Sequence, residues 1–172
     1  MTDIRPAMAE DIPTIQHLEL DAGQRFREIG MASVADDPPP SAEHLHSRIE
    51  TGTVWVAAEG DGYNIVGYAM ASIVDREGHL DQVSVALDRQ GQGIGRLLVE
   101  HVCAWAESEG FDGVTLTTFR HVAWNGPLYG CLGFEALPAE ALGPELAGIR
   151  ALEVQAGLDA EPRMAMRRPL RH

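Results

Sequence analysis

Cysteine is almost absent from this chain. Its 172 residues include only Cys103 and Cys131, which cannot form a disulfide framework. No cluster of cysteine and histidine has the spacing of a zinc site, so we expect no bound metal. Reduced thiols are typical of the cytoplasm, which is the location we expect for this protein.

Long apolar runs are also missing. The first residues, Met-Thr-Asp-Ile-Arg-Pro, lack the apolar region of a secretory signal. No window approaches the apolar length that a membrane-spanning helix needs. We therefore expect no membrane partner.

Basic residues are the minority among the charged ones. The chain has 13 Lys and Arg against 26 Asp and Glu, a formal net charge of −13 at pH 7. Binding to nucleic acid depends on basic patches, so this balance argues against a nucleic-acid partner. It is compatible with a cationic or amine-bearing substrate, and equally with an acidic protein that has no such substrate.

What remains is the composition of an ordinary globular protein. Hydrophobic residues make up 45% of the chain and charged residues 23%. The length is sufficient for one domain with a substantial core, and no internal repeat or linker divides it. We therefore predict a single domain over residues 1–172.

The most informative stretch covers residues 80–100, where a strand, a glycine loop and a helix follow one another. Leu80, Val83 and Val85 belong to a short apolar run that predicts a buried strand. Residues 90–95 have glycine at every second position, and apolar residues then recur at helical spacing.

Glycines at such a turn permit positive φ and let another group approach the backbone closely. The first turn of the helix that follows has unpaired N–H groups and the positive end of the helix dipole. Together they suit a phosphate or pyrophosphate. The alternative is a tight turn that binds no ligand.

Two common phosphate-binding motifs do not fit this loop. A P-loop requires a Gly-Lys pair, and the sequence has none. A dinucleotide-binding fingerprint would need its third glycine at position 96, which is Arg96. The phosphate ligand must therefore be recognised by another kind of loop.

The loop resembles the signature Q/R-x-x-G-x-G/A of the GNAT family, the GCN5-related N-acetyltransferases. Gln90, Gly93 and Gly95 fill the signature, and Gly91 matches its usual first glycine. The resemblance implies that the loop binds the pyrophosphate of acetyl-coenzyme A, while backbone groups of the preceding strand bind the pantetheine arm. The cofactor-binding residues that we predict are Val83, Ser84, Val85, Gln90, Gly91, Gln92, Gly93, Ile94, Gly95, Arg96 and Asn125.

The expected order of elements, β-α-α-β-β-β-α-β-α-β-(α)-β, is also similar to that of this family. The resemblance implies an α/β fold with a mixed, mostly antiparallel twisted sheet of about six to seven strands and helices on both faces. It further implies that the sheet is splayed between its fourth and fifth strands. Residues 31–40 are expected to be a loop, and residues 163–167 an edge strand able to pair with a second subunit.

A tyrosine motif completes the resemblance. The run from Tyr129 to Phe134 is similar to the family's Y-x-x-x-G-F, in which the tyrosine can protonate the departing thiolate. A phenol, with an ordinary pKa near 10, carries its proton at neutral pH and can donate it. The alternative is that Tyr129 packs on the core and its hydroxyl is hydrogen-bonded.

The acceptor must also lose a proton, because an alkylamine is almost wholly protonated at neutral pH. Many family members have a glutamate four residues before the position matching Val85, and here that residue is Asp81. Asp81 acts as the base, directly or through water, or it is a surface residue. His79, on the same strand face, is the alternative base. We predict Tyr129 and Asp81 as the catalytic residues.

Other positions stay open at this stage. The family often has an asparagine seven residues before the tyrosine, where this chain has Val122. Asn125 either reaches the cofactor or only caps a helix. Three acidic residues on the first helices, where the resemblance implies the substrate pocket, either bind a substrate cation or are solvated. They are Glu19, Asp21 and Glu28.

We therefore predict an acetyl-coenzyme A-dependent N-acetyltransferase that needs no metal. An amine of a small molecule or peptide attacks the thioester directly. Two alternatives are a non-catalytic coenzyme A-binding or sensing module on the same fold, and a nucleotide-binding protein unrelated to acyl transfer. The sequence leaves open whether the protein is a monomer or a homodimer.

Overall fold

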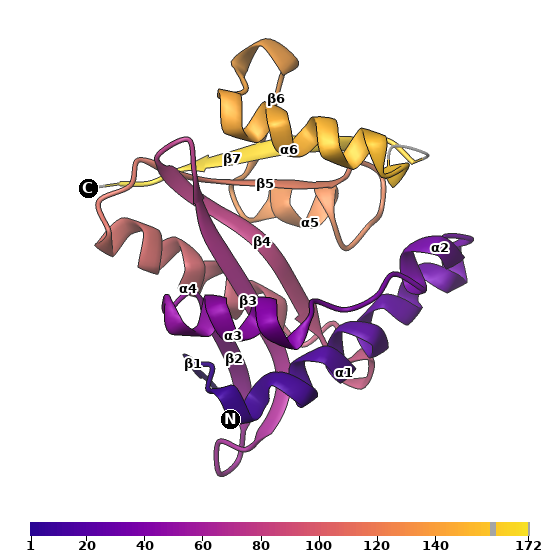
Figure 1. Cartoon of the computed structure of the whole chain (residues 1–172), viewed down its shortest axis with the longest axis vertical. Coiled ribbons are helices and arrows are strands. Elements are labelled where there is room, and N and C mark those ends of the chain that lie inside the picture. Colours follow the sequence, from indigo (N-terminus) through magenta and orange to yellow (C-terminus); the bar gives the residue numbers. More distant parts are fainter. Residues whose placement is uncertain (159–160, 172) are drawn as a thin grey trace. The chain divides into compact units, whose positions relative to one another are not determined.

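The computed structural model describes residues 1–158 and 161–171. It contains two compact units, each with its own packing. Unit 1 comprises Met1–Ala71 and Gln82–Val102, and unit 2 comprises Ser72–Asp81 and Cys103–His172. Their elements are labelled in Figure 1.

Within residues 1–158 and 161–171, seven strands form one sheet in the order β1-β2-β3-β4-β5-β7-β6. Antiparallel pairing joins β1 to β2, β2 to β3, β5 to β7 and β6 to β7, whereas β4 and β5 are parallel. The prediction of a mixed, mostly antiparallel α/β fold is therefore confirmed. The strands are β1 (Thr2–Pro6), β2 (Val54–Glu59), β3 (Asn64–Val74), β4 (Glu77–Val85), β5 (Gly113–Phe119), β6 (Glu135–Leu137) and β7 (Arg163–Pro169).

The described part of the chain also contains six α-helices. They are α1 (Ile12–Gly23), α2 (Ala32–Ala35), α3 (Ala42–Glu50), α4 (Ile94–Ser108), α5 (Gly126–Cys131) and α6 (Pro144–Gln155). Ser41 caps α3 as expected, because its hydroxyl accepts a hydrogen bond from the His44 N–H at 3.0 Å. The expectation of a plain loop over residues 31–40 is wrong, since α2 forms within it. The local hydrogen bond from Asp36 N–H to the Ala32 carbonyl closes this single turn.

In unit 1, α1 and α3 cover one face of β2 and β3. Alternate strand residues point to that face, as the pleat requires. Ile15 and Leu45, both fully buried, pack there in one cluster with Val54, Val56 and Tyr68. This packing fixes α1 against the strands, which matters below because α1 carries Glu19.

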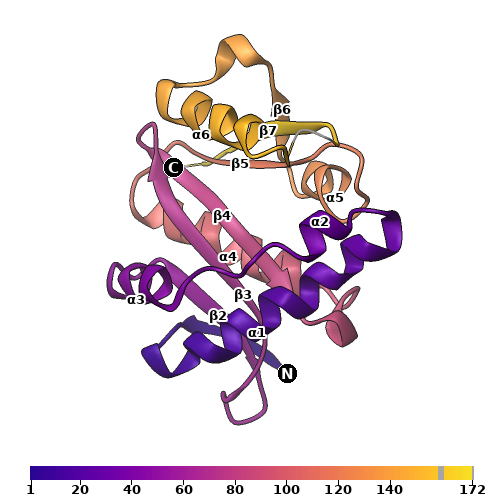
Figure 2. The ribbon, with the colours of Figure 1, turned by 45° about the vertical axis from the view of Figure 1, so that its right-hand side comes forward.

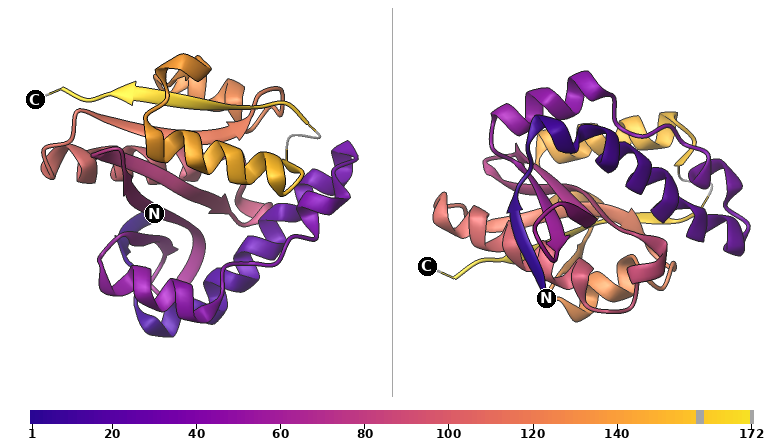
Figure 3. Two further views of the ribbon diagram at one scale, coloured as in Figure 1. Left: turned by 45° about the horizontal axis from the view of Figure 1, so that its top comes forward. Right: turned by 90° about the horizontal axis from the view of Figure 1, so that it is seen from below.

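The N-terminal part of α4 covers the opposite face of unit 1 (Figure 3). Trp55, which points away from the α1 face, meets His101 edge-on, with ring centroids 5.6 Å apart. Gly67 in β3 lets the helix approach closely, because a Cβ there would lie 3.1 Å from Leu98 Cδ1. The helix that follows the glycine loop is thus anchored on the strands of its own unit.

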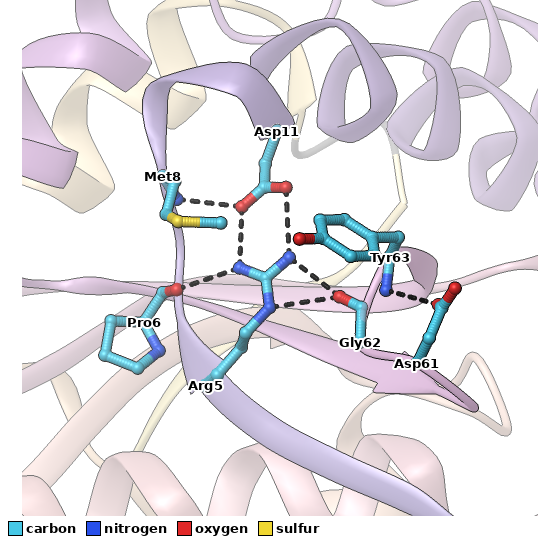
Figure 4. Close-up of polar contacts among 7 residues, drawn as sticks. All are labelled: Arg5, Pro6, Met8, Asp11, Asp61, Gly62 and Tyr63. Atoms are coloured by element: carbon cyan, nitrogen blue, oxygen red, sulfur yellow. Dashed lines mark hydrogen bonds and ion pairs between the residues drawn. The ribbon is translucent and has the colours of Figure 1, made fainter.

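An ion pair ties the end of β1 to the start of α1 and to the β2–β3 turn (Figure 4). Arg5 donates to both carboxylate oxygens of Asp11, at 2.8 and 3.1 Å, and to the Gly62 carbonyl at 3.0 Å. The Met8 N–H also donates to Asp11, at 2.8 Å. Burial by itself would raise the pKa of Asp11, but the hydrogen bonds from Arg5 and Met8 outweigh it and lower that pKa below its ordinary value.

In unit 2, α5 and α6 lie on opposite faces of β5 and β7 (Figure 2). Ala165 of β7 packs in a buried cluster with Leu146 of α6. Its neighbour Met164 points the other way, where a Cβ at Gly126 of α5 would lie 2.7 Å from Met164 Cε. This close approach holds the short α5, and with it the tyrosine motif, against the strands of unit 2.

The N-terminus of α6 is capped from a distant part of the chain. The carboxylate of Asp75, in the β3–β4 turn, accepts hydrogen bonds from the N–H groups of Glu145 and Leu146, both at 2.9 Å. Glu145 in return accepts from the Asp75 N–H at 2.6 Å. These bonds satisfy helix N–H groups that no side chain next to the helix reaches.

The last strand corrects a prediction. We expected residues 163–167 at an edge of the sheet, but β7 lies between β5 and β6. Its pairing with β5 runs from Gly113–Pro169 to Phe119–Arg163, and β6 pairs with its other side. Since both sides of β7 are hydrogen-bonded, this strand is not free to pair with a second subunit.

Candidate functional site

The glycine loop of unit 1 turns the chain from β4 into α4. Gly91 and Gly93 have φ of +81° and +83°, which side-chain-bearing residues rarely adopt. Gln90 closes the loop on the strand, because its Nε2 donates to the Val85 carbonyl at 3.0 Å. The Leu97 N–H then bonds to the Gly93 carbonyl at 3.1 Å and opens the helix. This geometry presents the first turn of α4 beside two residues without side chains.

The space beside this loop can admit a ligand. A Cβ at Gly91 or Gly93 would meet no atom of the protein within 4 Å. Arg96, in the first turn of α4, is exposed. Arg89 is instead engaged, because its Nε donates to Glu59 at 3.1 Å. The loop therefore combines open backbone, a helix N-terminus and one exposed guanidinium, which is what an anionic ligand requires.

The strand segment that precedes the loop is partly occupied by the protein itself. Ser84 is buried, and its hydroxyl donates to Glu19 of α1 at 2.7 Å. One acceptor position of the Val85 carbonyl is taken by Gln90. The prediction for Val83, Ser84 and Val85 concerns their backbone, and it stays a prediction.

Glu19 is the centre of a polar cluster that the sequence did not reveal. Besides Ser84, the Tyr68 hydroxyl and the Gln82 amide donate to its carboxylate, both at 2.6 Å. Burial, together with the charge of Glu19 and this hydrogen bond, raises the pKa of Tyr68 well above its ordinary value. Nothing in the pattern of β3 or β4 marks Tyr68 and Gln82, because strand alternation indicates a face and not a partner. Of the other two acidic candidates, Asp21 accepts from the Leu87 N–H at 2.8 Å.

Tyr129 lies in unit 2, on α5, where its ring packs edge-on against Phe134 with centroids 5.8 Å apart. Burial raises the pKa of Tyr129 to about 12, so the phenol keeps its proton throughout the neutral range. In the part of the chain that the structure describes, its hydroxyl has no hydrogen-bond partner. The role of Tyr129 as a proton donor stays a prediction.

Asn125 precedes the same helix but does not cap it. Its side chain makes no capping hydrogen bond, and its Oδ1 instead accepts from the Thr118 hydroxyl of β5 at 2.7 Å. The amide is thereby fixed at the end of β5. Its predicted contact with the cofactor stays a prediction.

Asp81 and His79 lie on the same face of β4, as the alternation predicted. The Ser72 hydroxyl donates to Asp81 Oδ1 at 2.8 Å, and His79 Nε2 lies 3.9 Å from that oxygen. His79 is 3% exposed, and its Nδ1 lies 2.8 Å from the Thr115 hydroxyl. Burial lowers the pKa of His79, although the Asp81 charge opposes this shift, so the imidazole is neutral at neutral pH. Of the two candidate bases, Asp81 is exposed and His79 is buried, and the role of Asp81 stays a prediction.

No group of three or more His, Cys, Asp or Glu side chains in residues 1–158 and 161–171 is arranged to hold a metal ion. None of the helices described there is sufficiently long and apolar to span a membrane.

The fold is found in several solved acetyltransferases. The structure superimposes on N-acetylglutamate synthase from Neisseria gonorrhoeae, complexed with coenzyme A and N-acetyl-glutamate, with a TM-score of 0.72 and 20% identity. That match covers 100% of this chain but 36% of the synthase chain. The ribosomal-protein-S18-alanine N-acetyltransferase from Escherichia coli gives a TM-score of 0.70 at 20% identity, covering 100% of this chain and 96% of that one. An acetyltransferase of the GNAT family from Staphylococcus aureus gives 0.75 at 17% identity, covering 99% and 100%.

At these low sequence identities, the TM-scores establish a shared fold, and a separate match of the sequence establishes the family. The model of the acetyltransferase (GNAT) family matches residues 16–134, which include most of α1, the glycine loop and the tyrosine motif. This match spans well over half of the 172 residues. The chain therefore belongs to the GNAT family of acetyltransferases.

Proposed function

We propose that this protein is an acetyl-coenzyme A-dependent N-acetyltransferase that acts on a primary amine of a small molecule or peptide. The observation that carries the proposal is the Tyr129 hydroxyl, which is protonated and has no partner among the described residues. A module that only binds coenzyme A needs the glycine loop but not a proton donor of this kind. An enzyme that releases a thiolate needs both.

Acetyl-coenzyme A supplies an activated acetyl group as a thioester. The loop of Gln90, Gly91, Gln92 and Gly93 would hold its pyrophosphate, with the first N–H groups of α4 as donors. Ile94, Gly95 and Arg96 belong to this first turn, and Arg96 adds a positive charge. Backbone groups of residues 83–85 would hold the two amides of the pantetheine arm in the manner of an added strand.

The reaction we propose is a direct transfer. The amine nitrogen attacks the thioester carbonyl carbon, so that a C–N bond forms and the C–S bond breaks. Tyr129 gives its proton to the departing sulfur, and Asp81 takes the proton of the amine, directly or through water. A backbone N–H near Val83 would polarise the carbonyl. We assign no role as nucleophile to Cys103, which is buried, or to Cys131.

We propose that residues 1–172 form one catalytic domain of a cytoplasmic enzyme. Neither a membrane nor a nucleic acid is among its proposed partners. Both cysteines are free, as a reducing compartment requires. The net charge of −13 suits a cationic acceptor better than a polyanion.

The test is thiol release from acetyl-coenzyme A with a panel of amines, together with thermal stabilisation by coenzyme A, ATP and NAD. We expect stabilisation by coenzyme A alone and amine-dependent thiol release. Stabilisation by coenzyme A without thiol release from any amine would identify a binding or sensing module instead. Stabilisation by ATP or NAD and not by coenzyme A would indicate an unrelated nucleotide-binding protein.

A further inference from the structure

Glu19 differs from four other carboxylates that the fold shelters, because each of those four faces an arginine that neutralises it. The pairs are Asp11 with Arg5 at 2.8 Å, Glu59 with Arg89 at 3.1 Å, Glu77 with Arg167 at 2.9 Å and Glu153 with Arg150 at 2.7 Å. Within the described part of the chain, no arginine forms an ion pair with Glu19, although this residue is also half-buried. Its negative charge is therefore left without a counter-charge.

The hydrogen bonds of Glu19 leave one acceptor position open. Oε2 accepts from the Tyr68 hydroxyl at 2.6 Å and from the Ser84 hydroxyl at 2.7 Å. Among the residues that the structure describes, Oε1 accepts only from the Gln82 amide, at 2.6 Å. A carboxylate offers about four acceptor positions, two on each oxygen. The unfilled position is thus on Oε1, in a group whose orientation three neutral donors already fix.

This arrangement is suited to a cation. A half-buried charge attracts an opposite charge more strongly than one in water does, because solvent screens it less. The fixed orientation removes part of the entropy cost of binding. Glu19 also contacts Ser84, which lies in the segment that we propose holds the pantetheine arm, and so it lies next to the place where an acceptor must arrive.

The cluster is not needed to hold α1 in place. Ile15 and Leu18 of this helix are already buried in the core of unit 1. Asp21 also fixes the end of the helix, because it accepts from the Leu87 N–H. Changing the charge of Glu19 should therefore leave the fold intact.

We propose that Oε1 of Glu19 binds the ammonium group of the acceptor before transfer, so that the enzyme selects amines that are cationic at neutral pH. This inference rests on the proposed acetyl transfer. Tyr68, Gln82 and Ser84 are positioning residues that hold the carboxylate. Neutral aromatic amines lack the charge and gain nothing from Glu19.

The test compares Glu19→Gln with the wild type on two classes of acceptor, alkylamines and aromatic amines, in the thiol-release assay. For alkylamines, KM should rise by about tenfold or more, because a charge-assisted hydrogen bond is lost. For aromatic amines, KM should not change, and neither should the affinity for acetyl-coenzyme A. Glu43→Gln makes the same change at an exposed position of α3 and is the matched control. It should leave KM for both classes of amine and the affinity for acetyl-coenzyme A unchanged.

The outcomes separate this inference from the function on which it rests. A wild type that releases no thiol with any amine overturns the proposed function and the inference with it. An active wild type that accepts aromatic amines only, or a Glu19→Gln variant with unchanged KM for alkylamines, overturns the role of Glu19 alone. An equal rise in KM for alkylamines and aromatic amines shows that Glu19 has a structural role, and it also overturns the proposed binding of the ammonium group. If Glu19→Gln fails to fold, Glu19→Asp gives the same test, with a smaller rise in KM expected for alkylamines only.

Discussion

Two sheltered carboxylates, one in each unit, are held in opposite ways. In unit 2, Glu153 lies between two arginines, at 2.7 Å from Arg150 and 3.1 Å from Arg163, and it also accepts from the Thr117 hydroxyl. In unit 1, Glu19 accepts only neutral donors. A charge that the chain neutralises serves to join its elements, here α6 with β5 and β7. A charge that the chain orients but leaves unneutralised is available to a ligand.

The units also carry different parts of the proposed reaction. Unit 1 holds the glycine loop and the strand residues 82–85, which would bind acetyl-coenzyme A. Unit 2 holds Tyr129 and Asp81, which would move protons. Binding and chemistry should therefore be separable by mutation, and the four predictions below test that division.

Removing the Tyr129 hydroxyl should have the largest effect. Tyr129→Phe keeps the ring that packs on Phe134 but loses the proton donor, so single-turnover acetyl transfer should slow by ~10²–10⁴-fold. The dissociation constant of acetyl-coenzyme A should change little. Tyr63→Phe, in an exposed residue of unit 1, is the control and should behave as the wild type. Full activity of Tyr129→Phe would remove this residue from the mechanism and leave water as the acid.

Neutralising Glu153 should act on stability. Glu153→Gln keeps the size of the side chain but removes the charged carboxylate that contacts Arg150 and Arg163, whose side chains are 17% and 11% exposed. Breaking such a pair should lower the free energy of unfolding by about 3 kcal/mol. Denaturant unfolding measures this loss, with Glu140→Gln in an exposed turn as the control. The affinity for coenzyme A at a temperature where the variant is folded should stay as in the wild type, and a large loss there would contradict the division between units.

Blocking the glycine loop should act on binding. Gly93→Val places a branched side chain at φ +83°, beside the space where the pyrophosphate would approach. Affinity for coenzyme A should fall by more than about tenfold, roughly 2 kcal/mol, in a protein that stays folded. Gly95→Ala is the matched control, because a Cβ there makes an ordinary 3.8 Å contact with Val85 and should be tolerated. Unchanged affinity of folded Gly93→Val, measured by calorimetry, would show that the loop does not bind the phosphates.

The smallest effect concerns pH and the Arg5–Asp11 pair of unit 1. The pKa of Asp11 is lowered in the folded protein. Its contribution to the free energy of unfolding is therefore fully present above the ordinary carboxyl pKa, and it is lost as the pH falls through the pKa of the folded state. At pH 7, Asp11→Asn should lower the free energy of unfolding by about 1.5 kcal/mol. This difference should narrow below about pH 4, where the wild-type carboxylate takes up its proton. Asp3→Asn, in an exposed residue of β1, should show no such trend, and a gap that widens in acid would contradict the assignment.

Much of the fold was predictable because its signals are local. The glycine loop, the helix that follows it and the hairpin over residues 53–74 are encoded in consecutive residues. Ser41 as a cap and Gly110 as a helix stop are of the same kind, and Gly110 does have a positive φ of 83°. The position of β7 was not predictable in this way. Alternation in its sequence indicates a strand but not which strands lie on either side of it, and only the pairing with β5 and β6 decides that.

The candidate site divides along the same line. By itself, the sequence determined the loop, the tyrosine motif and the family, because each is set by residue types at short spacing along the chain. The tertiary structure alone decided what these groups contact. Among the described residues, it left the Tyr129 hydroxyl without a hydrogen-bond partner, turned Asn125 toward Thr118 and kept His79 buried beside Asp81. It also brought Tyr68, Gln82 and Ser84 around Glu19. These three residues follow Glu19 in the sequence by 49, 63 and 65 positions, respectively. The reason is physical: a spacing rule describes neighbours on one helix or strand, whereas the charge and solvation of a side chain depend on whatever the fold packs against it.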